Sequence, residues 1–211
     1  MSFGISVDLN ALHQAIIRVR NAGILAVASG GNAGALVENY PAYYPETFAV
    51  GAVDSSKRWA SFNTYNDRIN LMAPGVGIVS TLSDGRIGSM DGTSMATPFV
   101  AGAAALMKRV CMKCTDQDIW QCLTDTAEPI SSCPSEKCGA GLLQAGAAYQ
   151  CLQNSPCCTV PEQLMSEEEP GQCKQHRMSC SQNSECCSGR CNRRGLCRRW
   201  RNLRDTDDDV E

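Results

Sequence analysis

Histidine and long apolar runs are what this chain has least of. Its 211 residues include two histidines, His13 and His176, so any imidazole-based chemistry would have to rest on one of them. No apolar run approaches the roughly 20 residues that span a bilayer, which argues against a transmembrane segment. The net charge of −3 gives no overall attraction for nucleic acid. The opening residues lack the charged and apolar regions of a signal peptide.

Cysteine, by contrast, is abundant. There are 14 cysteines, the first at Cys111. A reducing compartment rarely maintains such a set, so the pattern predicts disulfides and a secreted or lumenal protein. Zinc binding is the alternative, but the CxxC at 111–114 has no second CxxC to complete a site. Because a secreted protein needs a leader, we also expect an N-terminal part upstream of this chain.

The first part of the chain predicts a strand, a helix and a second strand. Residues 1–6 predict the short first strand. Asp8 is placed to cap a helix that ends near Ala22, and Gly23 follows where a glycine stops such a helix. The apolar run 24–28 is typical of a strand covered on both faces. Short connections between these elements predict a right-handed parallel unit.

The middle of the chain continues the same pattern. Further strands are predicted at 48–53 and 78–81. A helix of small residues opens shortly after Gly92, and its alanines and valines predict burial nearly all round. Residues 115–118 read as a capped helix start, and a last helix runs from about 142 to 152. The sequence therefore predicts an α/β fold with a parallel sheet.

The most informative motif lies at the start of the small-residue helix. It reads Gly92-Thr93-Ser94-Met95-Ala96-Thr97-Pro98-Phe99-Val100-Ala101-Gly102. Ser94 falls at a helix N-terminus, where unpaired N–H groups and the helix dipole favour negative charge. A serine there suits a nucleophile with an oxyanion beside it, whereas a lone serine would more simply cap the helix. The complete run resembles the nucleophile motif of subtilisin-like serine proteases, the subtilases.

Other segments resemble landmarks of the same family, in the family's order. They lie at 40–45, 49–54, 60–62, 72–75 and 137–143. The resemblance covers residues 1 to about 150 and implies a three-layer parallel-sheet domain, here truncated at its N-terminus and ending near residue 153. Phe99 departs from the family, which usually has a histidine there. That histidine is not catalytic, so the departure concerns local packing.

The resemblance also implies roles for individual residues. In the family a serine attacks the scissile carbonyl, a histidine takes its proton and an aspartate orients that histidine. Ser94 matches the nucleophile, and Asn32 resembles the asparagine of the oxyanion hole, with a turn asparagine as the alternative. Two segments resemble the backbone walls of the substrate pocket: Ser2-Phe3-Gly4 and Ser29-Gly30-Gly31. Phe3 is equally typical of a core residue.

The catalytic histidine and aspartate are missing. The family carries both upstream of the strand that begins this chain, and His13, His176, Asp8 and Asp54 match neither motif. We therefore expect a polypeptide-cleaving serine endopeptidase by family, with this chain inactive alone. A partner-binding pseudoprotease and a carrier of a bioactive peptide stay open. No cofactor is assigned, although families of this kind often bind calcium at a carboxylate position that is Asn70 here.

The composition changes after residue 153. Residues 154–172 predict a solvated linker, and 198–211 a charged tail. Between them, at 173–197, six cysteines leave no room for a hydrophobic core, so disulfides must hold this module. Its spacing resembles the inhibitor cystine knot, or knottin, with a generic disulfide staple as the alternative. The resemblance implies the pairs Cys173–Cys187, Cys180–Cys191 and Cys186–Cys197. The module's basic surface suits an anionic glycan, a membrane headgroup or an acidic protein, with a solvated basic face as an equal alternative.

Overall fold

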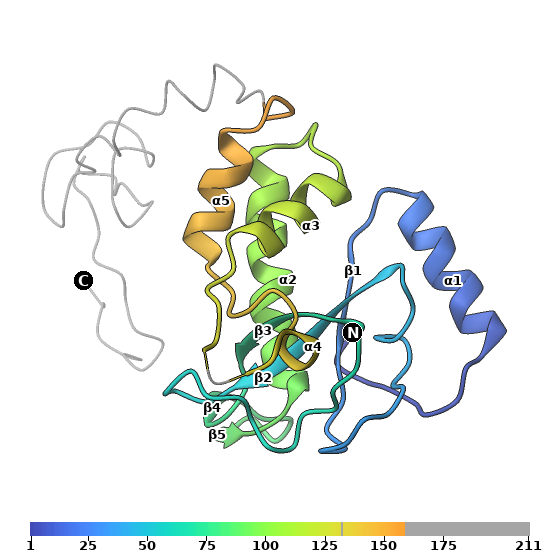
Figure 1. Ribbon diagram of the computed structural model, residues 1–211, viewed down its shortest axis with the longest axis vertical. Coiled ribbons are helices and arrows are strands. Elements are labelled where there is room, and N and C mark those ends of the chain that lie inside the picture. The colour runs from blue at the N-terminus through green and yellow to red at the C-terminus, as the bar shows by residue number, and fades with distance from the viewer. Residues whose placement is uncertain (132, 159–211) are drawn as a thin grey trace, which may run out of the picture. The chain divides into compact units, whose positions relative to one another are not determined.

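The computed structural model describes residues 1–131 and 133–158. Most of the predicted linker, the predicted cystine-knot module and the charged tail lie outside the described residues. The described elements follow in the order α1 (Asn10–Asn21), β1 (Ala26–Ser29), β2 (Thr47–Val53), β3 (Ile69–Pro74), β4 (Ile78–Thr81), β5 (Ile87–Met90), α2 (Thr93–Val110), α3 (Asp116–Asp125), α4 (Ser135–Cys138) and α5 (Ala145–Gln153). Figure 1 shows helices α2, α3 and α5 gathered beside the strands. None of the described helices is long and apolar enough to cross a membrane.

Strands β1, β2 and β3 form a parallel sheet in that order, which confirms the predicted α/β class. The strand expected at 1–6 is wrong except at its first residue. The amino group of Met1 donates to the carbonyl of Val27 at 2.5 Å, and the N–H of Ser29 donates to the carbonyl of Met1 at 3.0 Å. This pattern is that of a parallel ladder, but it does not continue, and Ile5 instead makes an isolated antiparallel bridge with Tyr40.

Side chains on the two faces of β2 enter different cores. Phe48 and Val50 belong to the larger cluster, which packs against α2, α3 and α5. Ala49 and Val53 belong to the smaller cluster, which includes Leu142 and borders α4. Every residue of β2 is buried, as expected for a central parallel strand covered on both faces.

The strand predicted at 78–81 exists, but it does not join the parallel sheet. It is β4, and it pairs antiparallel with β5 in a separate two-stranded hairpin. Most of the hairpin's residues are exposed. Strand β3, which the sequence reading did not include, instead supplies the third strand of the sheet.

Helix α1 does not use the cap expected from the sequence. Its N-cap is Leu9, with no side-chain hydrogen bond. The carboxylate of Asp8 instead accepts a hydrogen bond from the hydroxyl of Tyr44 at 2.9 Å, so a tertiary partner has taken the group that would have capped the helix. Gly23 has φ of 71° just after the helix, which fits its predicted place at the helix end.

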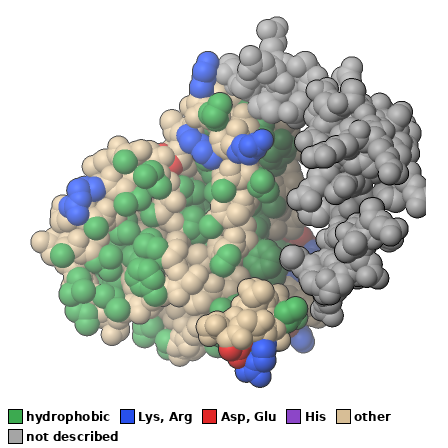
Figure 2. Space-filling model, turned by 180° about the vertical axis from the view of Figure 1, so that it is seen from behind, with side chains coloured by type: hydrophobic (Ala, Val, Ile, Leu, Met, Phe, Trp, Pro, Cys, Tyr) green, Lys and Arg blue, Asp and Glu red, His purple; other side chains and the backbone are tan. Residues whose placement is uncertain are grey.

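Helix α2 is buried on one face only, so the prediction of burial nearly all round is wrong. Ala96, Val100 and Met107 are buried against the sheet. Phe99 is 44% exposed and Leu106 is 63% exposed. Figure 2 shows hydrophobic side chains spread over the surface of the described chain seen from behind.

The two later helices match the sequence more closely. The hydroxyl of Thr115 accepts from the N–H of Asp118, while the carboxylate of Asp118 accepts from the N–H of Thr115. This reciprocal capping box confirms the predicted start of α3. The last helix, α5, begins at Ala145 rather than near 142, because Leu142 makes bridges with Met72 and Glu128.

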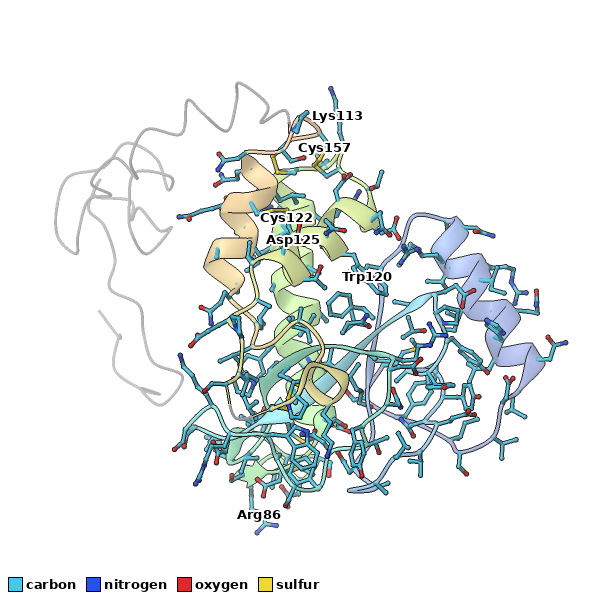
Figure 3. The ribbon with its side chains drawn as sticks, viewed as in Figure 1. Arg86, Lys113, Trp120, Cys122, Asp125 and Cys157 are labelled. Atoms are coloured by element: carbon cyan, nitrogen blue, oxygen red, sulfur yellow. A yellow bond between two sulfur atoms is a disulfide. The ribbon has the colours of Figure 1, made fainter. Side chains whose placement is uncertain are left out.

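All eight cysteines between 111 and 158 form disulfides. The pairs are Cys111–Cys158, Cys114–Cys157, Cys122–Cys151 and Cys133–Cys138. Three of them tie α3 and the end of α2 to α5 and the residues just after it, where Figure 3 labels Cys122 and Cys157. The sequence alone leaves this pairing open, because eight cysteines can pair in many ways. Because Cys157 and Cys158 are bonded to this unit, its covalent links extend into the first residues of the predicted linker.

Candidate active site

The turn that holds Ser94 rests on the carboxyl end of strand β3. Ser94 is the second residue of α2, and Gly92 is the N-cap with φ of 148°. The N–H of Gly92 donates to the carbonyl of Gly75 at 2.7 Å. A Cβ on Gly75 would lie 2.8 Å from the carbonyl oxygen of Gly92, so only glycine permits this approach. The end of the sheet therefore fixes where α2 begins.

Asn32 reaches the same helix start from the carboxyl end of β1. Its Oδ1 accepts hydrogen bonds from the N–H of Thr93 at 3.0 Å and from the Thr93 hydroxyl at 2.9 Å. The Thr93 hydroxyl in turn accepts from the N–H of Gly31 at 3.1 Å. Thr93 is 1% exposed, so a buried threonine joins the asparagine loop to the helix that carries Ser94.

Two hydrogen-bond donors remain free beside Ser94. With its oxygen committed to Thr93, Asn32 has its amide nitrogen over Gly92, where a Cβ would lie 3.1 Å from Nδ2. Within the described residues neither this nitrogen nor the N–H of Ser94 has a hydrogen-bond acceptor. Unpaired donors at a helix N-terminus suit a developing oxyanion. The arrangement can therefore stabilise a tetrahedral intermediate formed on Ser94.

The hydroxyl of Ser94 faces a carbonyl rather than a base. It donates to the carbonyl oxygen of Ser2 at 3.3 Å, and the hydroxyl of Ser2 donates to the carbonyl oxygen of Ser94 at 3.0 Å. These bonds bring together Ser2 and Ser94, which are 92 positions apart in sequence. A peptide carbonyl can orient the hydroxyl but cannot remove its proton near neutral pH, so this pair alone gives a weak nucleophile.

The described histidine takes no part in this site. Nε2 of His13 lies 3.0 Å from Oε2 of Glu46, and the ring stacks on Tyr44 with centroids 4.1 Å apart. His13 is on α1, in the small aromatic cluster that includes Tyr40 and Tyr44. These contacts favour a structural role for His13, which matches no catalytic motif in the sequence.

Asp8 and Asp54, the two aspartates considered from the sequence, also form contacts away from Ser94. Asp8 bonds to Tyr44, and Asp54 forms an exposed turn with Arg58. Hydrogen bonding from the backbone of Arg58 lowers the pKa of Asp54. Neither carboxylate has a histidine partner among the described contacts, so neither stands in the arrangement of a catalytic aspartate.

The two expected substrate-binding segments lie side by side. The N–H of Ser29 bonds to Met1, and the Ser29 hydroxyl donates to the carbonyl of Phe3 at 3.5 Å. Phe3 is 55% exposed, which contradicts its alternative reading as a core residue. Gly30 packs closely, since a Cβ there would lie 2.7 Å from Cδ1 of Ile69. The structure thus brings both segments to the edge of the sheet where Ser94 stands.

An apolar groove of about 420 Å³ also borders Ser94. The hairpin of β4 and β5 forms one flank, and the first turns of α2 form the other. The side chains of Met90, Met95 and Phe99 line it together with Ser94 itself. The open groove leaves Phe99 exposed, at the position where its identity departs from the family pattern.

Metal binding receives little support from the described residues. Oδ1 of Asn70 accepts the N–H of Ala49 at 2.7 Å, at the point where the β2–β3 register shifts, so this oxygen already serves the sheet. One group of potential ligands gathers among residues 1–131 and 133–158, namely Cys114, Asp118 and Cys157. Its two cysteines are bonded to each other and offer no thiolate.

Thr93 and Gly75 are the site residues that the sequence reading missed. Both lie in segments that resemble family motifs, so the sequence contains these residues but does not show their roles. Their roles depend on contacts with Asn32 and Gly92, which come from distant parts of the chain. Only the folded arrangement shows that Thr93 orients the asparagine amide.

Comparisons with known proteins agree with this geometry. Residues 1–149 match the model of the Subtilase family. A thermostable alkaline protease from Halalkalibacterium halodurans is 45% identical over 150 residues, which is 71% of this chain and 41% of that protein. Subtilisin Savinase from Lederbergia lenta is 40% identical over 148 residues, covering 70% of this chain and 54% of its own length. The chain thus spans about half the length of the curated relatives it matches.

A solved structure also resembles the chain. The prenylagaramide maturation protease PagA superposes with a TM-score of 0.67 at 28% sequence identity, covering 72% of this chain and 60% of that one.

Proposed function

We propose that this chain, which belongs to the subtilase family, carries the nucleophile and oxyanion hole of a serine endopeptidase. The observation that supports this most directly is the convergence of Ser94, Asn32 and Thr93 at the N-terminus of α2. The substrate would be a polypeptide lying along the segments 2–4 and 29–31. Disulfides among eight cysteines support a secreted or lumenal location.

The chemistry follows from the groups at the helix start. Oγ of Ser94 attacks the scissile carbonyl carbon, and the carbonyl oxygen gains negative charge. That oxyanion accepts hydrogen bonds from Nδ2 of Asn32 and from the N–H of Ser94, the two donors beside Ser94 that have no acceptor among the described residues. A base takes the proton of Ser94 during the attack and passes it to the leaving nitrogen, so that collapse expels a neutral amine and leaves an acyl-enzyme on Ser94, which water then hydrolyses. Thr93 acts as a positioning residue, because it holds the oxygen of Asn32 and so aims the nitrogen.

The proton of Ser94 needs a base that the described residues do not provide. We therefore propose that a histidine and an aspartate from outside residues 1–211 complete the site, and that this chain alone is inactive. Loss of triad members in intact proteases of this class costs on the order of a million-fold in turnover. A residual rate of roughly a thousand-fold over water comes from the oxyanion hole and substrate binding.

A serine-directed fluorophosphonate probe tests the proposal. We expect very slow labelling of this chain, because the hydroxyl of Ser94 stays protonated, and fast labelling of a full-length protein that supplies the base. Mass mapping should place the label on Ser94, and Ser94→Ala should abolish it. Ser56→Ala, at an exposed turn, is the matched control and should change nothing. Fast labelling of this chain alone would show that residues 1–211 contain the base.

A pseudoprotease is the second candidate. The observation that favours it is the reciprocal bonding of Ser94 with Ser2, which engages the hydroxyl without a base. A full-length protein that contains both missing residues yet fails to label at Ser94 would support this reading.

The C-terminal assignments remain proposals. We propose a cystine-knot module at 173–197 between a linker at 154–172 and a tail at 198–211, and a basic surface on the knot that binds an anionic partner. Non-reducing peptide mapping decides the pairing: Cys173–Cys187, Cys180–Cys191 and Cys186–Cys197 are expected, and a Cys186–Cys187 bond would contradict it. Release of this module as a free peptide would favour the carrier role and would appear as a fragment in intact-mass analysis.

A further inference from the structure

Two cysteines and an aspartate form a compact cluster of potential metal ligands at the start of α3. One side-chain atom from each of Cys114, Asp118 and Cys157 lies within 4.8 Å of the other two. In the oxidised protein the two sulfur atoms are bonded to each other, so the cluster offers three ligands only when that bond is reduced. None of the three residues belongs to the Ser94 site, and the cluster is therefore separate from the proposed protease function.

The carboxylate of Asp118 is held in place with one oxygen unused. Its Oδ2 accepts hydrogen bonds from the N–H and from the hydroxyl of Thr115, both at 2.7 Å. Among the described residues its Oδ1 has no hydrogen-bond donor. The capping box of α3 thus fixes this side chain and leaves one of its oxygens available to a cation.

A neighbouring disulfide would keep the cluster together after the Cys114–Cys157 bond opened. The Cys111–Cys158 bond joins the same two chain segments, because Cys158 directly follows Cys157 and Cys111 lies in the turn that leads to Cys114. The two thiols would therefore remain close to each other and to α3. A site whose ligands are already gathered loses little chain entropy when it binds a metal.

Electrostatics favour reduction of the bond at Cys114 over the bond at Cys111. Cys114 directly precedes the N-cap of α3, where the helix dipole favours negative charge, and the ammonium of Lys108 donates to its carbonyl at 2.5 Å. Cys111 is the C-cap of α2, where the dipole opposes negative charge, and its sulfur lies 3.8 Å from the carbonyl oxygen of Leu152. Cys114 is thus the better thiolate leaving group.

We infer that the Cys114–Cys157 bond is redox-labile and that its reduction creates a zinc site formed by these two thiolates and the carboxylate of Asp118. Two sulfurs and one oxygen suit Zn²⁺, which often takes three protein ligands and a water molecule. Without a cation the three negative groups would repel one another. Zinc should therefore stabilise the reduced form.

A small dithiol can supply the two electrons. One of its thiolates attacks Sγ of Cys157, which is half-buried, whereas Cys114 is 0% exposed. The sulfur–sulfur bond breaks, its electron pair stays on Cys114, and a mixed disulfide forms on Cys157. The second thiol of the reductant attacks its own sulfur in that mixed disulfide, so that Cys157 leaves as a thiolate and the reductant departs as a cyclic disulfide. The two protons of the dithiol pass to solvent when Zn²⁺ takes both thiolates.

Graded reduction of the whole chain tests the order in which the bonds open. The oxidised chain is treated with increasing amounts of dithiothreitol, free thiols are alkylated, and the modified cysteines are mapped by mass spectrometry. We expect Cys114 and Cys157 to be alkylated at lower doses than Cys111 and Cys158. Simultaneous opening of the two bonds, or the reverse order, would overturn the inferred lability.

Metal titration of the selectively reduced chain tests the site itself. The reductant is removed under anaerobic conditions at the dose that opens this bond, and Zn²⁺ or Co²⁺ is added. Relative to the oxidised chain, we expect one further equivalent of bound zinc and, with cobalt, near-ultraviolet absorption from thiolate-to-metal charge transfer. Cys114→Ala combined with Cys157→Ala, treated identically, should show neither. Equal binding by that variant, or no zinc once alkylation shows the bond to be open, would overturn the site.

Substitution of the aspartate tests the third ligand. Asp118→Asn can still accept the hydrogen bonds of Thr115, but it should weaken zinc affinity by about tenfold or more, since loss of even an outer partner of a metal ligand has an effect of that size. Asp125→Asn, at the exposed last residue of the same helix (Figure 3), is the matched control and should bind zinc normally. Competition with a chromophoric chelator measures each affinity. Equal affinities in the two variants would reject Asp118 as a ligand, and if Asp118→Asn does not fold, as judged by circular dichroism, Asp118→Glu, which keeps a carboxylate at a shifted position, should likewise weaken binding.

Discussion

The disulfides Cys111–Cys158 and Cys114–Cys157 should be largely redundant. Both join the end of α2 to the residues after α5, with sequence separations of 47 and 43. Once either bond exists, the other closes only the short path through 112–113 and the peptide bond between Cys157 and Cys158. We therefore expect removal of one bond to cost much less than removal of both.

The chain-entropy model gives the magnitudes. Because Cys122–Cys151 stays in place, the first of the two bonds closes a path of about 20 residues and stabilises the folded state by about 3 kcal/mol, whereas the second closes about four residues and adds about 2 kcal/mol. Removing one pair should therefore lower the free energy of unfolding by about 2 kcal/mol, and removing both by about 5 kcal/mol. The double loss exceeds the sum of the single losses by about 1 kcal/mol.

A double-mutant cycle measures this difference directly. The variants are Cys111→Ala with Cys158→Ala, Cys114→Ala with Cys157→Ala, and all four substitutions together. Urea unfolding, followed by tryptophan fluorescence, gives each free energy. Losing the sulfur atoms also changes packing, but this effect is present both in the single-pair variants and in the four-fold variant, so it largely cancels in the cycle.

The short Cys133–Cys138 loop, with a separation of 5, is the control. The loss of unfolding free energy on removing this bond should add to the loss from removing either pair, within about 0.5 kcal/mol. If the losses of unfolding free energy for the two long-range pairs simply add, the argument from redundancy is refuted. Each bond would then restrict the unfolded chain independently of the other.

Two further predictions concern the start of α3 and the turn before Ser94. Thr115→Ala removes the capping box and should lower the free energy of unfolding by about 1 kcal/mol. The hydrogen bond from the Thr115 side chain lowers the pKa of Asp118, so the stability from this carboxylate is present above its unfolded pKa and is lost as pH falls through the lower folded value. Urea unfolding at pH 7 and pH 3 should show a smaller acid loss in Asp118→Asn, and an unchanged loss would contradict this account. Gly92→Ala should push the Asn32 amide away and slow probe labelling of Ser94 in the full-length protein by roughly a hundred-fold or more, the effect of losing one oxyanion donor. Gly102→Ala is the control, because an added Cβ there meets nothing within 4 Å, and Ser94 in this variant should be labelled at the normal rate. Equal labelling rates in both variants would show that Asn32 is not part of the oxyanion hole.

Local features of this protein could be predicted from the sequence alone. The capping box of α3 depends on residues three positions apart, and the placement of Ser94 at a helix N-terminus depends on neighbouring residues in one motif. The apolar run at 48–53 likewise predicts a buried strand, whichever strands it pairs with. These properties follow from short-range hydrogen bonding and from the burial of consecutive apolar side chains.

Only the tertiary structure decided which distant groups meet. Residues 78–81 form a strand as expected, but their pairing with β5 rather than with the sheet depends on a partner that no local pattern identifies. Asp8 had the right identity to cap α1 but bonds to Tyr44, because a hydroxyl from a distant loop competes for the same carboxylate. Eight cysteines allow 105 pairings, so proximity in the fold must select one. The hydrogen bonds between Thr93 and Asn32 have the same origin, because they join residues 61 positions apart that only the fold brings together.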